Sequence, residues 1–148
     1  MAPAPHETYF ANEVLTATPQ KLHLMLIEAA IRLGNQTLEH WREGRDTQAS
    51  ESIVRCQRIL AEMLKGLRPK QMPELVGKVA SVYIFLYRSF VQAQLQRDPV
   101  QLNDALRVLE IERETWRKVC EQLGSRQSPS SFISAPHVSP TSRFDLEA

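Results

Sequence analysis

YFANEVLTATPQKLHLML, residues 9–26, is the stretch of the chain that decides its fold. Its second half predicts the start of a helix, because the hydroxyl of Thr18 can accept a hydrogen bond from a backbone N–H of the first helical turn. Pro19 then occupies the first helical position, where its missing N–H costs nothing. Apolar residues at helical spacing follow from Leu22 onward, so we expect a long helix that begins at Pro19.

The first half of the stretch, residues 9–17, is predicted to form an extended arm with apolar side chains at Tyr9, Phe10 and Val14. A helix cap explains the pair Thr18-Pro19, but it does not explain the spacing of the apolar residues that precede it. Residues 1–8 are expected to be disordered.

Three more helices are indicated by signals of the same kind. Gly44 fits the left-handed residue just past a helix end, and Asp98-Pro99 repeats the cap-then-proline start. The expected helices span about residues 19–42 or 43, 46 or 47–67, 73–97 and 99–123, and Gly124 closes the last one. Helices of some 20–25 residues are about 30–37 Å long. Four such helices with short links predict an all-α fold, an antiparallel up-down four-helix bundle with an extended N-terminal arm and a disordered C-terminal tail.

The domain organisation is inferred from length and composition. One domain is the default for 148 residues, and we expect it over residues 1–124, including the arm. Residues 125–148 are dense in Ser and Pro, which favours a disordered tail. A fully solvated tail and a tail with weak docking points both remain open, the candidate points being Phe132, Ile133, Phe144 and Leu146.

The charge balance and the cysteines narrow the classes of function. The formal net charge is +1, from 18 Lys and Arg against 17 Asp and Glu, which argues against nucleic-acid binding through a concentrated basic face. Cys56 and Cys120 lie inside helical patterns and are interpreted as buried thiols, which suits a reducing cytosol. No apolar run reaches the ~18 residues of a membrane helix, and the start lacks the basic and apolar regions of a signal peptide. We therefore expect a cytoplasmic protein without membrane insertion.

Motifs for catalysis and for cofactor binding are missing from the sequence. Di-iron bundles need Glu-x-x-His pairs, and none of the four histidines follows a Glu at that spacing. The two cysteines lack zinc spacing, and no phosphate-binding glycine motif occurs among five glycines. We expect a protein that is not an enzyme and has no cofactor and no metal.

The helices carry more apolar surface than a four-helix core needs. Each fully exposed Leu, Ile or Phe forgoes roughly 1.5–3 kcal/mol of burial, and soluble monomers seldom leave such a surface contiguous. The first helix is expected to face the core with Leu22, Met25, Leu26, Ala29 and Leu33. The apolar residues outside the expected core stripes are Leu24, Ile27, Ile31, Ile59, Ile84, Phe85, Val91, Val108, Ile111 and Val119. Two interpretations remain open: a broad core, or a surface covered by the arm, by a second copy or by a segment of another protein.

The stretch at residues 9–26 resembles the opening of the flagellin-specific export chaperones of bacteria, the FliS family. An aromatic stretch at residues 79–94, VASVYIFLYRSFVQAQ, and Trp116 also fit the pattern of that family, so the resemblance covers roughly residues 9–120. It implies a cytoplasmic four-helix bundle that binds the disordered C-terminal segment of flagellin in apolar surface grooves. Such a chaperone prevents premature polymerisation and aids export during flagellum assembly.

The resemblance also implies a role for the apolar residues outside the core stripes. Together with Tyr9, Phe10 and Val14 of the arm, they are the candidate partner-binding residues, and the arm could act as a displaceable lid. The resemblance leaves open whether the flagellar export gate binds as well, and whether the free protein is a monomer or a weak dimer. The alternative is an all-α adaptor or homodimeric structural protein unrelated to flagellin.

Four positions depart from the family pattern, among them Gln94, where the family typically closes an apolar-x-Ala-Asn ending. Ile27 stands where many members carry Tyr, and Ile84-Phe85 stands where a polar Asp-Tyr pair is common. These differences predict a more apolar groove that forms fewer hydrogen bonds. We therefore expect a divergent flagellin as the partner.

Overall fold

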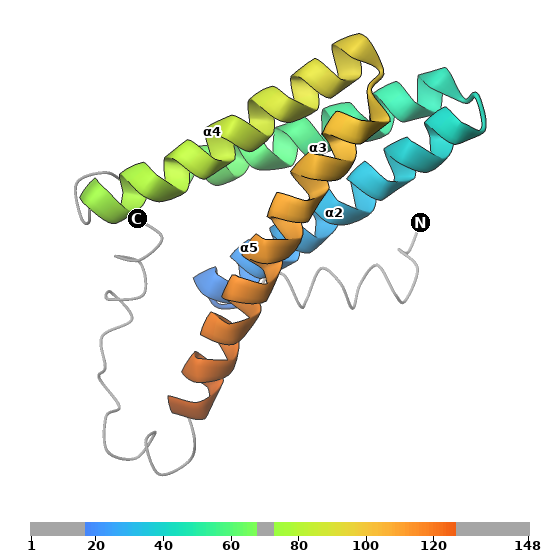
Figure 1. The fold of residues 1–148 in the computed structure, drawn as a ribbon. Helices are drawn as coiled ribbons and strands as arrows, with labels where there is room; N and C mark the ends of the chain where they lie inside the picture. The colour runs from blue at the N-terminus through green and yellow to red at the C-terminus, as the bar shows by residue number, and fades with distance from the viewer. Residues whose placement is uncertain (1–16, 68–72, 127–148) are drawn as a thin grey trace, which may run out of the picture.

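The computed structural model describes residues 17–67 and 73–126 of the chain (Figure 1). This part consists of four α-helices and contains no strand. The helices are α2 (Pro19–Arg42), α3 (Asp46–Lys65), α4 (Pro73–Gln96) and α5 (Pro99–Arg126). The predicted all-α fold is confirmed, whereas residues 9–16 of the expected arm and residues 127–148 of the expected tail lie outside the described residues.

The start and the end of α2 follow the local signals in the sequence. The backbone N–H of Lys21 donates to Thr18 Oγ1 over 3.1 Å, and Pro19 occupies the first helical position. At the other end Gly44 has a φ of 73°, a left-handed conformation that glycine adopts without a steric penalty. The expected bounds of the first helix are therefore confirmed.

A turn of only two residues, Arg97 and Asp98, joins α4 to α5. Arg97 has a φ of 48°, and the carboxylate of Asp98 accepts hydrogen bonds from the backbone N–H groups of Val100 and Gln101 over 3.0 and 3.3 Å. The carboxylate satisfies backbone donors that have no partner inside the helix. The cap predicted at Asp98-Pro99 is confirmed, and the short turn makes α4 and α5 antiparallel neighbours.

Three of the expected helix ends differ from the structure, and the smallest difference is in the third helix, which ends at Gln96 rather than at residue 97. The second helix stops at Lys65 rather than at residue 67. Its end is closed by hydrogen bonds from the backbone N–H of Gly66 to the Glu62 carbonyl over 3.1 Å and from that of Leu67 to the Leu64 carbonyl over 3.2 Å. The last helix continues to Arg126 and passes through Gly124. A glycine inside a helix costs roughly 1 kcal/mol relative to alanine, which does not suffice to end a helix held by its neighbours.

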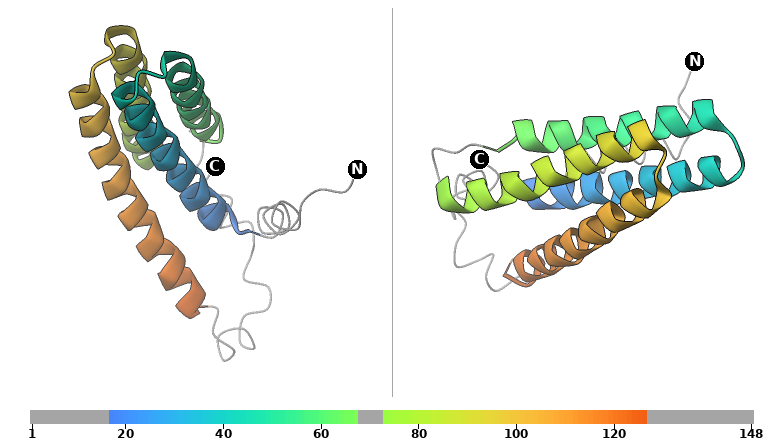
Figure 2. Two further views of the ribbon diagram at one scale, coloured as in Figure 1. Left: turned by 90° about the vertical axis from the view of Figure 1, so that its right-hand side faces the viewer. Right: turned by 45° about the horizontal axis from the view of Figure 1, so that its top comes forward.

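The helices form a bundle that opens at one end. α2 packs against α3 and α5, and α4 also packs against α3 and α5. Figure 1 and Figure 2 show that α4 runs along α3, whereas α5 crosses α2 obliquely and diverges from α4 with distance from their common turn. The core between the helices is built from Ile27, Ala30, Ile31, Leu33, Ile53, Cys56, Leu60, Met63, Tyr83, Leu86, Phe90, Ala93, Leu102, Ala105, Leu106 and Leu109.

The face of α2 that points into this core is not the predicted one. Leu24, Ile27 and Ile31 are buried, whereas Leu22 is 37% exposed. The prediction of an outward stripe at the three buried residues is therefore wrong, although Leu33 is buried as expected. Two neighbouring helices cover α2, so its buried face is broad, and this face also carries Gln20 and Thr37. These polar residues make the true core face look less apolar than its neighbour.

No helix in residues 17–67 and 73–126 is long and apolar enough to cross a membrane. Within the same residues, no cluster of three or more His, Cys, Asp or Glu side chains could hold a metal ion.

Candidate partner-binding groove

A hollow of about 490 Å³ lies between the outer faces of α4 and α5. We call it the α4–α5 groove. Its lining comes almost entirely from α4, and one residue of α5 completes it: Ser81, Ile84, Phe85, Arg88, Ser89, Gln92 and Gln101.

The outer face of α4 carries a stripe of side chains spaced alternately three and four residues apart. All of them are exposed: Lys78, Ser81, Phe85, Arg88, Gln92 and Leu95. This is the spacing at which one helix presents side chains to another helix packed along it. The opposite face of α4 already packs into the core through Tyr83, Leu86 and Phe90. α4 therefore has a second contact stripe that no helix in the described part of the chain covers.

A similar stripe follows the flank of α5 that faces α4. It consists of Gln101, Asp104, Val108, Ile111 and Thr115, all exposed or half-buried. Gln101 shows that this flank faces α4, because its side-chain amide donates to Gln92 Oε1 of α4 over 3.0 Å. The other flank of α5 faces α2, since Leu106 lies against Gly34.

The amide bridge between Gln92 and Gln101 lies near the α4–α5 turn and closes that end of the groove. From there the two helices diverge (Figure 1). The large apolar side chains at the groove are incompletely covered: Ile84 is 41%, Phe85 56% and Ile111 65% exposed. The groove is thus closed at the turn by two amides, and its apolar lining comes from Ile84 and Phe85 of α4. Ile111 continues the exposed apolar surface further along α5.

Beneath the diverging helices lies a cluster of polar and aromatic side chains from three helices. His23 Nε2 of α2 and the Tyr83 hydroxyl of α4 share a hydrogen bond, and the indole ring of Trp116 of α5 lies 4.3 Å from the imidazole, between ring centroids. Since both hydrogen-bonding groups are largely enclosed, they connect the first turns of α2 to the middle of α4.

Burial shifts the pKa values of this cluster. It lowers the pKa of His23 from 6.5 to about 4, because enclosure disfavours the imidazolium. Burial, reinforced by the negative charge of Glu112, raises the pKa of Tyr83, and burial also raises the pKa of Glu112. At neutral pH His23 is therefore neutral, and the cluster holds the helices together by hydrogen bonding and packing rather than by charge.

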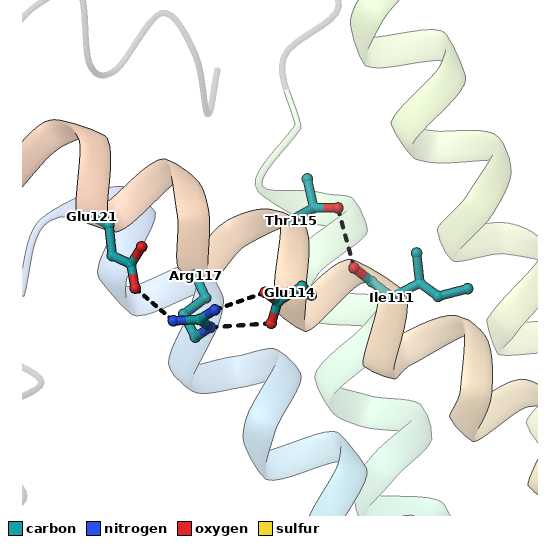
Figure 3. A network of polar contacts seen from close by, with 5 residues as sticks. All are labelled: Ile111, Glu114, Thr115, Arg117 and Glu121. Atoms are coloured by element: carbon teal, nitrogen blue, oxygen red, sulfur yellow. Dashed lines mark hydrogen bonds and ion pairs between the residues drawn. The ribbon is translucent and has the colours of Figure 1, made fainter.

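The distal half of α5 also carries interactions between its own side chains. Figure 3 shows Arg117 between Glu114 and Glu121, with a bidentate contact to Glu114 at 3.1 and 2.7 Å. The hydroxyl of Thr115 donates to the backbone carbonyl of Ile111 over 3.1 Å. No described residue of α5 beyond Leu109 is fully buried, so this part of the helix leaves a side free for a partner.

A second hollow, of about 780 Å³, lies between the C-terminal end of α2 and the α4–α5 turn. Two of the residues that line it are arginines already in ion pairs: Arg42 pairs with Glu39, and Arg97 pairs with Asp46. Because both arginines already have acidic partners, this hollow is less suited than the α4–α5 groove to an acidic partner.

The sequence-predicted binding residues separate into groups in the structure. Ile84 and Phe85 line the α4–α5 groove, and Val108 and Ile111 lie on the α5 stripe that continues from Gln101. Leu24, Ile27 and Ile31 are enclosed by the bundle. The remaining candidates in the described residues are half-buried: Ile59, Val91 and Val119. Of these, Ile59 packs against the core from α3. Tyr9, Phe10 and Val14 lie outside the described residues.

The sequence-based search missed the polar residues of the groove. Ser81, Gln92, Gln101, Asp104 and Thr115 share the three-and-four spacing with the exposed apolar residues. That spacing is visible in the sequence, but a search for apolar residues alone passes over it. His23 and Tyr83 were missed for another reason, because residues so far apart in the sequence carry no local signal of their contact.

Comparison with known proteins identifies the family. The model of the family described as flagellar protein FliS matches residues 1–123 of this chain. The chain is 29% identical over 120 residues to the flagellar secretion chaperone FliS of Bacillus subtilis (strain 168), and the match covers 79% of this chain and 86% of that protein. With the family model matched over most of its length, and with a bundle of four helices in the described residues, the chain belongs to the FliS family of flagellar proteins.

Proposed function

We propose that the protein is a cytoplasmic export chaperone that binds the disordered C-terminal segment of flagellin in the α4–α5 groove. Binding keeps this segment from polymerising before export. Membership of the FliS family and the name of the Bacillus subtilis relative, a flagellar secretion chaperone, support the class of function. No chemical step is needed, because the chaperone acts by binding and release.

One observation carries the choice of the groove: the two unfilled stripes on α4 and α5 have the spacing that accepts a helix. A disordered segment that becomes helical can place its own apolar stripe between them, as in other helix-in-groove interactions. Contact with Ile84, Phe85 and Ile111 would remove apolar surface from water, which is the dominant favourable term in such association. We also propose contacts from Val108 and from the arm residues Tyr9, Phe10 and Val14.

The test is a calorimetric titration of the full chain with the C-terminal ~50 residues of flagellin from the same organism. We expect saturable binding with a negative change in heat capacity, the signature of apolar burial with coupled folding. Absence of binding by a folded protein would contradict the proposal.

Sedimentation over a range of concentrations examines the alternative of a homodimeric structural protein. A tight dimer that does not bind flagellin would mean that a second copy covers the exposed stripes.

A further inference from the structure

We infer that the α4–α5 groove selects a helix with an acidic side chain three or four residues from a large apolar one, the acid lying on the side of the α4–α5 turn. This inference rests on the proposed function and names the chemistry by which the flagellin segment would be recognised.

The groove contains a single formal charge among the residues that line it, the guanidinium of Arg88. The charged residues of α4 are Glu74, Lys78 and Arg88. The residues three and four positions from Arg88 along the helix are uncharged, so no acid of α4 lies within reach of it. Arg88 forms no ion pair within residues 17–67 and 73–126.

The acid of the α5 stripe, Asp104, pairs with a residue of its own helix. Asp104 lies 3.7 Å from Arg107 on its own helix. Two of the polar side chains near Arg88 in the groove are uncharged and donate elsewhere. The Ser81 hydroxyl donates to the carbonyl of Gly77 over 2.9 Å. The amide of Gln101 donates to Gln92. The guanidinium therefore offers donors to a carboxylate, with a geometry that suits two parallel hydrogen bonds.

The relative positions of Phe85 and Arg88 determine on which side of the apolar residue the acid of the bound helix must lie. Phe85 and Arg88 are three residues apart on one exposed stripe, and Arg88 lies nearer to the Gln92–Gln101 bridge. A helix lying along α4 with a large apolar residue on Phe85 brings the residue three or four positions away onto Arg88. An acid there lies toward the closed end of the groove. An acid on the other side of the apolar residue lies toward Lys78, in the open part.

The experiment titrates the flagellin C-terminal segment into the full chain, into Arg88→Gln and into Arg55→Gln, at two or more salt concentrations. Arg55 is an exposed arginine of α3 outside the groove, so it controls for the loss of one positive charge. We expect Arg88→Gln to bind about tenfold more weakly, equivalent to about 1.4 kcal/mol, and to lose part of the salt dependence. Arg55→Gln should bind as the original chain does.

A charge exchange completes the test. Arg88→Glu should weaken binding further, and replacement of one acidic residue of the segment by Lys should restore it. If the original chain binds and Arg88→Gln binds equally well with the same salt dependence, the inference is overturned while the proposed function stands. If the original chain does not bind the segment, both fall. Because Arg88 is exposed, we expect its variants to fold as the original chain does. Circular dichroism of each variant checks this.

Discussion

At the scale of single residues, His23 links the protonation of the protein to its stability. Its imidazole is enclosed by Tyr83 of α4 and by Trp116 of α5. Because its pKa is about 4 in the folded protein against an ordinary value of 6.5, the unfolded chain binds this proton more readily. The contribution of His23 to the free energy of unfolding should be constant above pH ~6.5 and should fall between about pH 6.5 and pH 4.

We predict that this fall amounts to roughly 3 kcal/mol, at about 1.4 kcal/mol per pKa unit. The raised pKa of Glu112 acts in the opposite direction, because protonation relieves the burial of its charge. The measurement is therefore a comparison of denaturant unfolding across this pH range for the original chain, His23→Gln and His40→Gln. His23→Gln should lose the dependence and His40→Gln should retain it. An equal pH dependence in all three would refute the assignment.

At the scale of elements, Gly34 sets how closely α2 and α5 approach. A Cβ added at this position would overlap the Cδ2 methyl of Leu106, which is only 3% exposed. Gly77 of α4 is the natural contrast, because a Cβ added there meets nothing within 4 Å. The two glycines therefore separate the packing effect of a methyl group from its effect on helix propensity.

We predict opposite effects of the same substitution at these two positions. Gly34→Ala should lower the free energy of unfolding by about 1 kcal/mol, since overpacking of a core typically costs about 1–3 kcal/mol and the gain in helix propensity offsets part of it. Gly77→Ala should raise it by roughly 0.5–1 kcal/mol. Urea unfolding measures both. Stabilisation by Gly34→Ala would show that α5 can move away from α2 without loss.

At the scale of the whole molecule, packing density falls along α5. Its fully buried residues, Leu102, Ala105, Leu106 and Leu109, all lie in the first half. Beyond them the helix diverges from α4, as Figure 2 also shows. We predict that backbone amides after Leu109 exchange with deuterium markedly faster than those from Leu102 to Leu109, because local opening exposes little apolar surface there. Uniform protection along α5 would contradict this description.

The same contrast of scales explains what could be predicted from the sequence. Thr18-Pro19, Gly44 and Asp98-Pro99 locate helix ends because their hydrogen bonds and dihedral angles are local. The inward face of α2 could not be assigned, since Leu22 and Leu24 are equally apolar and only packing between α3 and α5 decides between them. The groove depends on the divergence of α4 and α5, so Phe85 and Ile111 could be named as surface candidates but not placed together.

The central claim is that the α4–α5 groove binds flagellin, and two residues of α5 with equal exposure test it most directly. Ile111 is 65% and Val100 66% exposed, but only Ile111 belongs to the groove stripe. In a calorimetric titration with the flagellin C-terminal segment, Ile111→Ala should weaken binding about tenfold, and Phe85→Ala by at least as much, because each removes an apolar contact worth roughly 1.5–3 kcal/mol. Val100→Ala should bind as the original chain does. Equal affinities for Ile111→Ala, Phe85→Ala and Val100→Ala would place the binding surface elsewhere.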